Sequence, residues 1–252
     1  MELDKIGQKL TAEFVGTFAL VFIGAGAVIM GPSENSTTVG VALASGLVYA
    51  VMVSVLAHIS GAHFNPAVTI GVWVTGNIKT GLAGAYIGTQ LVAAAIAALL
   101  LRGLYPEPAW KAANLGAPGL GQGVSSGQGV LLEAVLTFFL VFAVYGTAVD
   151  DRGPFAKTAG LTIGLVLTFG IFAGGPLTGA AMNPARAFGP MLVGGHWSDW
   201  WVYWIGPIGG GVIAAAVYWF AFLDGREKLA SARKSEHPIG GPTESDWSDE
   251  PA

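Results

Sequence analysis

Cysteine is absent from this sequence, which excludes a disulfide framework and a thiolate metal site. Charged residues are also scarce, at 11% of the chain against roughly 25% in soluble domains. Hydrophobic residues make up 53%, and the mean hydropathy is +0.60. The net charge is −4, without a basic block of the kind that binds nucleic acid. This composition indicates a protein of the lipid bilayer with no nucleic-acid partner.

Six apolar stretches are long enough to cross a bilayer, which takes about 20 residues. They cover approximately residues 10–30, 39–58, 83–103, 128–149, 157–173 and 200–222. The first is too long for a signal-peptide core, and Glu2 and Asp4 precede it. We therefore expect it to be retained as the first span.

Two shorter apolar stretches, about 66–75 and 184–194, each begin with Asn-Pro-Ala. Asparagine is a favoured N-cap residue, and proline is tolerated at the first helical position because its missing N–H has no partner there. These stretches are too short to cross alone, so they are predicted to form half-helices. The motif residues are Asn65, Pro66, Ala67, Asn183, Pro184 and Ala185.

The two halves of the chain repeat each other. AEFVGTFALVF at 12–22 is similar to LEAVLTFFLVF at 132–142, and the two motif asparagines are 183 − 65 = 118 positions apart. Each repeat, about 10–103 and 128–222, has three crossings, so the second enters the membrane from the opposite side. The predicted fold class is an all-α membrane protein with six transmembrane helices and two re-entrant half-helices in an inverted repeat.

Lysine and arginine gather on one side of these spans, which places both termini in the cytoplasm by the positive-inside rule. Residues 1–9 form the cytoplasmic N-terminus, and 223–252, rich in Pro, Gly, Ser and acids, are predicted to be a disordered cytoplasmic tail. The residues on that side are Lys5, Lys9, Lys79, Arg152, Lys157, Arg226, Lys228, Arg233 and Lys234, against Arg102, Lys111 and Arg186 opposite.

An inverted repeat brings the N-termini of the two half-helices together near the midplane. Each terminus carries about +0.5 elementary charge, so the pair repels protons and cations, while the Asn65 and Asn183 amides can donate hydrogen bonds to a neutral oxygen. Non-helical backbone at this depth must line a wet cavity or be buried in protein. We expect the loops His58–Phe64 and Ala173–Met182 to line a pore for neutral solutes.

At this point the sequence resembles the major intrinsic protein, or aquaporin, family through AEFVGTF, HISGAHFNPAV, YIGTQ, NPARAFGP and YWIGP. The resemblance extends to about residue 222. It implies a passive plasma-membrane channel for water and small uncharged solutes. It also implies a homotetramer with one pore per subunit, no catalytic residues and no cofactor.

In that family an arginine after the second motif, here Arg186, sits in an outer constriction. Spacing from the two asparagines gives Ser45, Ile171 and Ala180 as the other constriction positions. Water-specific members carry an aromatic residue and a histidine where Ser45 and Ile171 stand. Because Ser45 and Ala180 are small, we expect the constriction to be wider than in those members. This set of residues resembles that of plant nodulin-type channels for boric acid and related metalloid hydroxides.

Other family markers disagree with this interpretation. Glycerol facilitators carry Asp and a basic residue at the positions of Ala187 and Met191, and Tyr203–Trp204 is an aromatic pair as in water channels. The permeant therefore stays open between water alone and a set that includes glycerol, urea or metalloid hydroxides.

Four further residues have alternative roles. His58 and His63 could sense pH near their ordinary pKa of about 6.5 or support the first loop, the role we favour. Glu13 and Glu133, in the first turns of their spans, could relay protons as in transporters or accept hydrogen bonds from the re-entrant loops, which we favour.

An ion-coupled transporter would need a carboxylate pair or cation site near the midplane, where the sequence offers only asparagine. An enzyme is the third alternative and is not expected, because no nucleophile-base set, phosphate loop or metal-ligand cluster appears.

Overall fold

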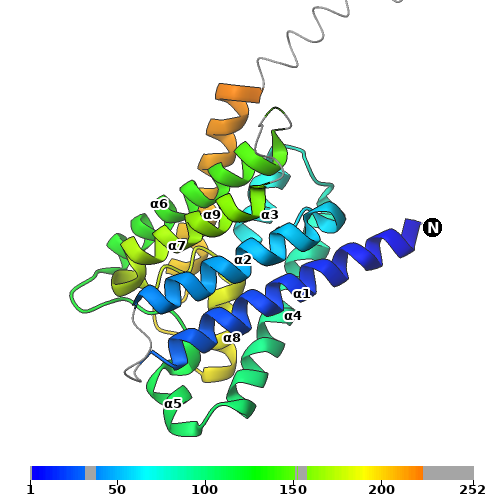
Figure 1. The fold of residues 1–252 in the computed structure, drawn as a ribbon. Coiled ribbons are helices and arrows are strands. Elements are labelled where there is room, and N and C mark those ends of the chain that lie inside the picture. The colour runs from blue at the N-terminus through cyan, green and yellow to red at the C-terminus, as the bar shows by residue number, and fades with distance from the viewer. Residues whose placement is uncertain (1, 32–37, 151, 153–157, 224–252) are drawn as a thin grey trace, which may run out of the picture.

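The computed structural model describes residues 2–31, 38–150, 152 and 158–223, and all regular elements among them are helical. Six long helices lie side by side in one bundle (Figure 1). They are α1 (Glu2–Ile29), α2 (Thr38–Ser60), α4 (Thr80–Leu104), α6 (Ser126–Val144), α7 (Ala159–Thr178) and α9 (Val202–Tyr218). One π-helical turn extends α6 to Val149 and another extends α9 to Leu223. All six are long and apolar enough to cross a bilayer, which confirms the predicted fold class.

Two short helices, α3 (Pro66–Val74) and α8 (Pro184–Gly194), begin at the Asn-Pro-Ala motifs. With a rise of about 1.5 Å per residue they reach roughly 14 and 17 Å, about half of a bilayer core. Asn65 Oδ1 accepts a hydrogen bond from the Ala67 N–H at 2.8 Å, and Asn183 Oδ1 accepts one from Ala185 at 2.9 Å. The side chain of each asparagine therefore caps its own half-helix, as N-cap residues do.

The two repeats interlock through their half-helices. Within the repeats, α1 packs against α2 and α4, and α6 packs against α7 and α9. Between them, α2 packs on α7, α3 on α9 and α8 on α4 (Figure 1). At the α2–α7 crossing, a Cβ on Gly164 would lie 2.4 Å from the Gly46 carbonyl oxygen, so glycine is required there. Each half-helix is thus held by the third span of the other repeat.

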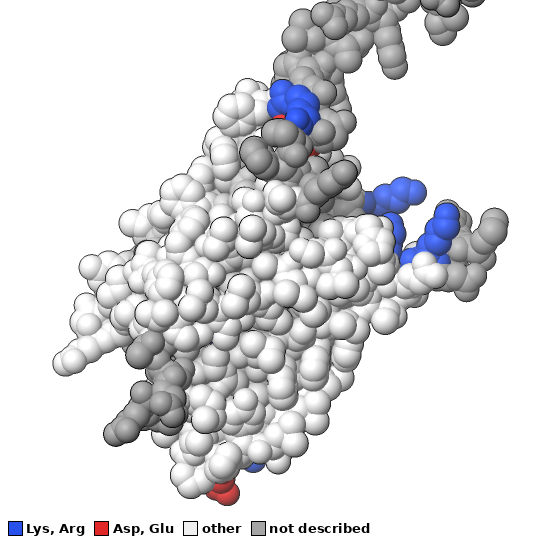
Figure 2. All heavy atoms as spheres, viewed as in Figure 1, with Lys and Arg blue, Asp and Glu red and all other residues white. Residues whose placement is uncertain are grey.

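The surface of the bundle is divided by charge. Figure 2 shows a broad face almost free of charged spheres, with Lys and Arg at the end that holds the N-terminus and beside the end of α9. At the opposite end, exposed Glu107 pairs with Lys111 on the short helix α5 (Glu107–Ala112). The white face is what lipid-exposed helices require. Lys157 and the basic residues predicted beyond position 223 lie outside the described residues, as does the predicted tail apart from Leu223.

Several predicted boundaries are wrong. Helix α1 begins at Glu2, well before residue 10, so Glu13 lies in its interior, and Glu133 likewise lies inside α6. His58 belongs to the last turn of α2, and α7 continues to Thr178 through Pro176. The polar and glycine-rich ends of these helices lower the local hydropathy without breaking the helix. The loops at the pore therefore begin at Gly61 and Gly179, both with positive φ.

An ion pair ties the end of α6 to the end of α9. Arg152 donates to both Asp150 carboxylate oxygens from Nε, at 2.8 and 3.1 Å, and its Nη2 donates to the Phe222 carbonyl at 3.0 Å. Tyr218 Oη donates to Asp150 Oδ2 at 3.1 Å. The Arg152 hydrogen bonds hold the pKa of Asp150 well below its ordinary value of 3.8.

We expect Asp150→Asn to flatten the loss of stability in acid. A carboxylate whose pKa is depressed in the folded state stabilises it above the unfolded pKa, about 3.9, and the effect disappears as pH falls further. Melting temperatures of detergent-solubilised protein between about pH 6 and pH 2 measure this. Equal slopes for the native protein and Asp150→Asn would contradict it.

Candidate functional site

The first pore loop is held by one buried carboxylate from α1. Glu13 Oε1 accepts hydrogen bonds from the Ser60 hydroxyl at 2.7 Å and the His63 N–H at 2.9 Å. Its Oε2 accepts from the Phe64 N–H at 2.7 Å and the Gln90 side-chain amide at 2.8 Å. Glu13 is fully buried, and these four donors satisfy a charge that would otherwise be costly to bury.

The second repeat builds the same support from α6. Glu133 accepts hydrogen bonds from the Thr178 hydroxyl at 2.8 Å, the Ala181 N–H at 2.9 Å and the Met182 N–H at 2.8 Å. It is also fully buried. The fourth donor of the first repeat is missing, since Pro207 occupies the place in YWIGP that Gln90 has in YIGTQ. Both acids are thus occupied by the loops that they hold.

Both loops have an unusual backbone. Ala62 and Phe64 in the first loop have φ of 52°, and Ala180 and Met182 in the second have φ of 44° and 50°. A left-handed conformation costs a non-glycine residue about 1–2 kcal/mol. The hydrogen bonds to Glu13 and Glu133 stabilise these conformations. No turn motif in the sequence predicts these left-handed conformations.

The motif asparagines join the two repeats. Asn65 Nδ2 donates to the Met182 carbonyl at 2.7 Å, and Asn183 Nδ2 donates to the Phe64 carbonyl at 2.9 Å. An amide nitrogen carries two hydrogens, so each of these groups uses one across the repeat boundary and retains one. Both residues lie on the wall of the cavity described next.

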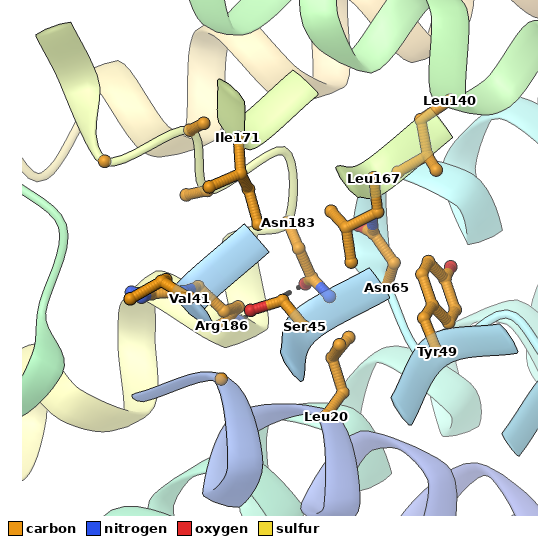
Figure 3. A pocket seen from close by; sticks show the side chains of 14 residues that line it. Leu20, Val41, Ser45, Tyr49, Asn65, Leu140, Leu167, Ile171, Asn183 and Arg186 are labelled. Carbon is orange, nitrogen blue, oxygen red and sulfur yellow. Dashed lines mark hydrogen bonds between the residues drawn. The ribbon is translucent and has the colours of Figure 1, made fainter. Parts of the chain in front are cut away.

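A narrow cavity lies inside the described bundle, lined by residues of α1, α2, α6, α7, α8 and the two loops (Figure 3). The volume open to the centre of a water molecule is about 20 Å³, and one water requires about 10–15 Å³. The cavity therefore accepts small molecules one at a time. In Figure 3, Arg186 and Ile171 lie toward one end, and Asn65, Leu140 and Tyr49 lie toward the other.

A wider vestibule of about 450 Å³ adjoins one end of the narrow cavity. Val41, Ile171, Gly179 and Arg186 line both spaces, so they mark the transition between them. Among the residues that the structure describes, neither space has Asp or Glu in its lining. The described walls offer hydrogen bonds to a solute without a counter-charge for a cation.

All four predicted constriction residues line the narrow cavity. Ser45 comes from α2, Ile171 from α7, Ala180 from the second loop and Arg186 from the first turn of α8. Arg186 Nη1 donates to the Gly116 carbonyl at 2.8 Å. That carbonyl belongs to a 3-10 turn, Asn114–Gly116, that the sequence analysis did not predict. Packing of Gly116 against Ala25 fixes the turn, since a Cβ there would lie 2.6 Å from the Ala25 oxygen.

The two histidines occupy different environments. His58 is exposed, whereas His63 is 7% exposed and its Nδ1 lies 3.1 Å from the Thr69 hydroxyl. The partner of the His63 ring is therefore a hydroxyl of α3. Tyr49, which the sequence analysis missed, donates from Oη to the His63 carbonyl at 3.0 Å and lines the narrow cavity.

Comparison with known proteins agrees with this architecture. The family model described as "Major intrinsic protein" matches residues 2–218. The chain belongs to the major intrinsic protein family. Members that are aquaporins are channels and not enzymes, so the chain is an integral membrane channel of this family.

Named relatives of this major intrinsic protein include plant aquaporins. "Aquaporin TIP4-4" of Zea mays is 47% identical over 220 residues, 84% of this chain and 85% of the relative. "Probable aquaporin TIP3-2" of Arabidopsis thaliana is 42% identical over 237 residues, 87% of this chain and 85% of the relative. The X-ray structure of the aquaglyceroporin from Plasmodium falciparum has a TM-score of 0.77 at 24% identity, over 89% of this chain and 99% of the other. It shares the fold.

Proposed function

We propose that this protein is a passive channel for water and small uncharged solutes that excludes protons and ions. The observation that carries the proposal is the pair of capped helix N-termini, Asn65 and Asn183, on the wall of a cavity wide enough for one water. Two N-termini directed at one point make it positive. A neutral molecule passes such a point, and a cation is repelled.

Proton exclusion follows from the direction of the hydrogen bonds. A water at this point accepts from the remaining N–H of Asn65 or Asn183, so its own hydrogens turn away from the asparagines. Apolar side chains of Leu20, Leu140 and Leu167 line part of the narrow wall and offer this water no hydrogen-bond partner. The water cannot accept and donate along the file at once, which interrupts proton transfer.

The proposed selectivity filter is Ser45, Ile171, Ala180 and Arg186. Arg186 donates to the oxygen of a permeant and adds positive charge against cations, while Ser45 and Ala180 are small and leave width. We propose that glycerol, urea and boric acid pass together with water. Glu13 and Glu133 carry no transport role, since both are buried behind the loops that they support.

The double variant Ser45→Phe, Ile171→His should restrict the channel to water. An aromatic ring fills the width beside Ser45, and histidine adds a donor that water satisfies better than a larger solute. Stopped-flow light scattering on proteoliposomes should show glycerol, urea and boric acid permeability lower by about tenfold or more, the scale for misfit in a shaped site, with water flux retained. A native protein that passes water alone would refute the wide filter.

The same vesicles distinguish a channel from an ion-coupled transporter. A passive channel gives solute flux that does not change when a sodium or proton gradient is imposed. Flux that stops when the gradient is removed would support the transporter, whose coupling site would then require a carboxylate in the lumen. The described residues that line the two cavities include no carboxylate.

We further propose a homotetramer in the plasma membrane with both termini cytoplasmic. The lysines at the start of α1 and before α4, with Arg152, support this orientation by the positive-inside rule. Protease digestion of sealed cells and chemical crosslinking measure the two properties. Cleavage of the C-terminal tail from outside the cell would reverse the orientation.

A further inference from the structure

Gly24 faces the lumen from the C-terminal part of α1. It lies on the wall of the narrow cavity, beside Ser45 and on the same passage as Arg186. A Cβ on Gly24 would lie 3.2 Å from Ser45 Oγ and 4.0 Å from Ser45 Cβ, and no other atom of the described residues outside its own stretch of helix is within 4 Å. The space beside Gly24 therefore belongs to the channel.

Other glycines of α1 have different surroundings. A Cβ on Gly16 would lie 2.1 Å from the Phe64 ring, and one on Gly26 would lie 2.9 Å from Tyr105 Oη. Gly16 and Gly26 are therefore needed for the close packing of α1 against Phe64 and Tyr105. Gly24 meets only the end of a short side chain, so a methyl group there leaves the fold intact and reduces the lumen.

Ser45 forms the other side of this space. Its side chain is 6% exposed, and no hydrogen bond to its hydroxyl exists within the described part of the chain. The hydroxyl is thus available to a permeant. Because the narrow cavity accepts about one water at a time, the absence of a single methyl group beside Ser45 changes the largest molecule that can pass.

We propose that Gly24 is a specificity-determining residue that, with Ser45, forms a recess in the channel wall for solutes wider than water. The recess supplies width and one hydroxyl, while Arg186 supplies donors from α8. A polyol, urea or boric acid uses both the recess and the Arg186 donors, whereas water needs only the Arg186 donors. This inference rests on the proposed function, since it concerns which neutral solutes that channel admits.

Gly24→Ala should lower glycerol and urea permeability by about tenfold, the lower end of the effect of one methylene in a fitted site, and should leave most of the water permeability. Gly7→Ala is the matched control, because Gly7 lies on the same helix and a Cβ there meets no atom of the described residues within 4 Å. Stopped-flow measurements on vesicles with equal amounts of protein give both permeabilities.

The double variant Gly24→Ala, Ser45→Ala tests the route of the effect. Removing Oγ leaves the new methyl group only the Cβ contact at 4.0 Å, so the solute flux should return most of the way to that of Ser45→Ala alone. A flux that stays low would show that the methyl group acts elsewhere and would overturn the inference.

Two outcomes separate this inference from the proposed function. Native protein that conducts no solute larger than water would overturn both. Native protein that conducts glycerol and urea, with the same solute-to-water ratio in Gly24→Ala, would overturn the role of Gly24 alone. An equal fall of water and solute flux in Gly24→Ala would also overturn it, because the position would then limit all passage.

Discussion

Replacing Arg186 with alanine should raise the proton permeability of the channel by about a hundredfold. Arg186 is half-buried where the narrow cavity meets the vestibule. Two unit charges about 4 Å apart interact with about 4 kcal/mol at an effective dielectric constant of 20. Loss of about two-thirds of that repulsion corresponds to the hundredfold change, since about 1.4 kcal/mol is tenfold. Proton flux into vesicles that contain a pH-sensitive dye measures it.

Arg102→Ala is the matched control for this experiment. Arg102 is exposed, donates to the Val193 carbonyl at 3.2 Å and lies over the Trp110 ring. Arg102 lines neither cavity. The Arg102→Ala variant therefore shows the effect of losing a positive charge that lies outside the lumen. Equal proton leaks in the two variants would show that Arg186 has no special part in exclusion.

Replacing Glu133 with alanine should destabilise the folded channel by about 3–5 kcal/mol. Three donors, the Thr178 hydroxyl and the Ala181 and Met182 N–H groups, would lose their acceptor in a buried loop. Each unpaired buried donor costs about 1–3 kcal/mol. The left-handed conformations of Ala180 and Met182 would lose their support in the same step. Thermal or denaturant unfolding in detergent measures the change.

Two further variants make this result specific. Glu13→Ala should have an effect at least as large, because Glu13 has four donors. Glu107→Ala removes an exposed carboxylate whose pairing with Lys111 is screened by water, and its unfolding should match that of the native protein. A proton relay would instead predict folded Glu133 and Glu13 variants whose flux alone is altered.

The six spans and the two half-helices could be predicted because each has a local signal. Length and hydropathy mark the spans, and Asn65 and Asn183 followed by proline mark the starts of α3 and α8. Helix ends were predicted less well, because Pro176 and the glycines beside it lower hydropathy without ending α7. The short helix α5 and the turn before Gly116 have no periodic apolar pattern to reveal them.

The residues around the pore could be predicted only where the motif spacing of the family identifies a position whose side chain lines the pore. Ser45, Ile171, Ala180 and Arg186 all lie on one cavity wall, yet the acceptor for Arg186 is a backbone oxygen, which has no residue-type signal. The left-handed φ of Ala62, Phe64 and Met182 depends on contacts with Glu13 and Glu133 far away in the chain. Gly24 could not be predicted, because no residue pattern in the sequence indicates the open space beside it.

The backbone of the second loop also limits how this channel can change its permeants. Ser45 and Ile171 stand on regular helices, where side chains of any size fit the local conformation. Ala180 stands at φ 44°, where β-branched residues are rare outliers. Random mutation can therefore narrow the ring readily from α2 and α7, while a β-branched side chain at the loop position would strain the backbone. Selection for a new solute in this channel would act mainly through two helices.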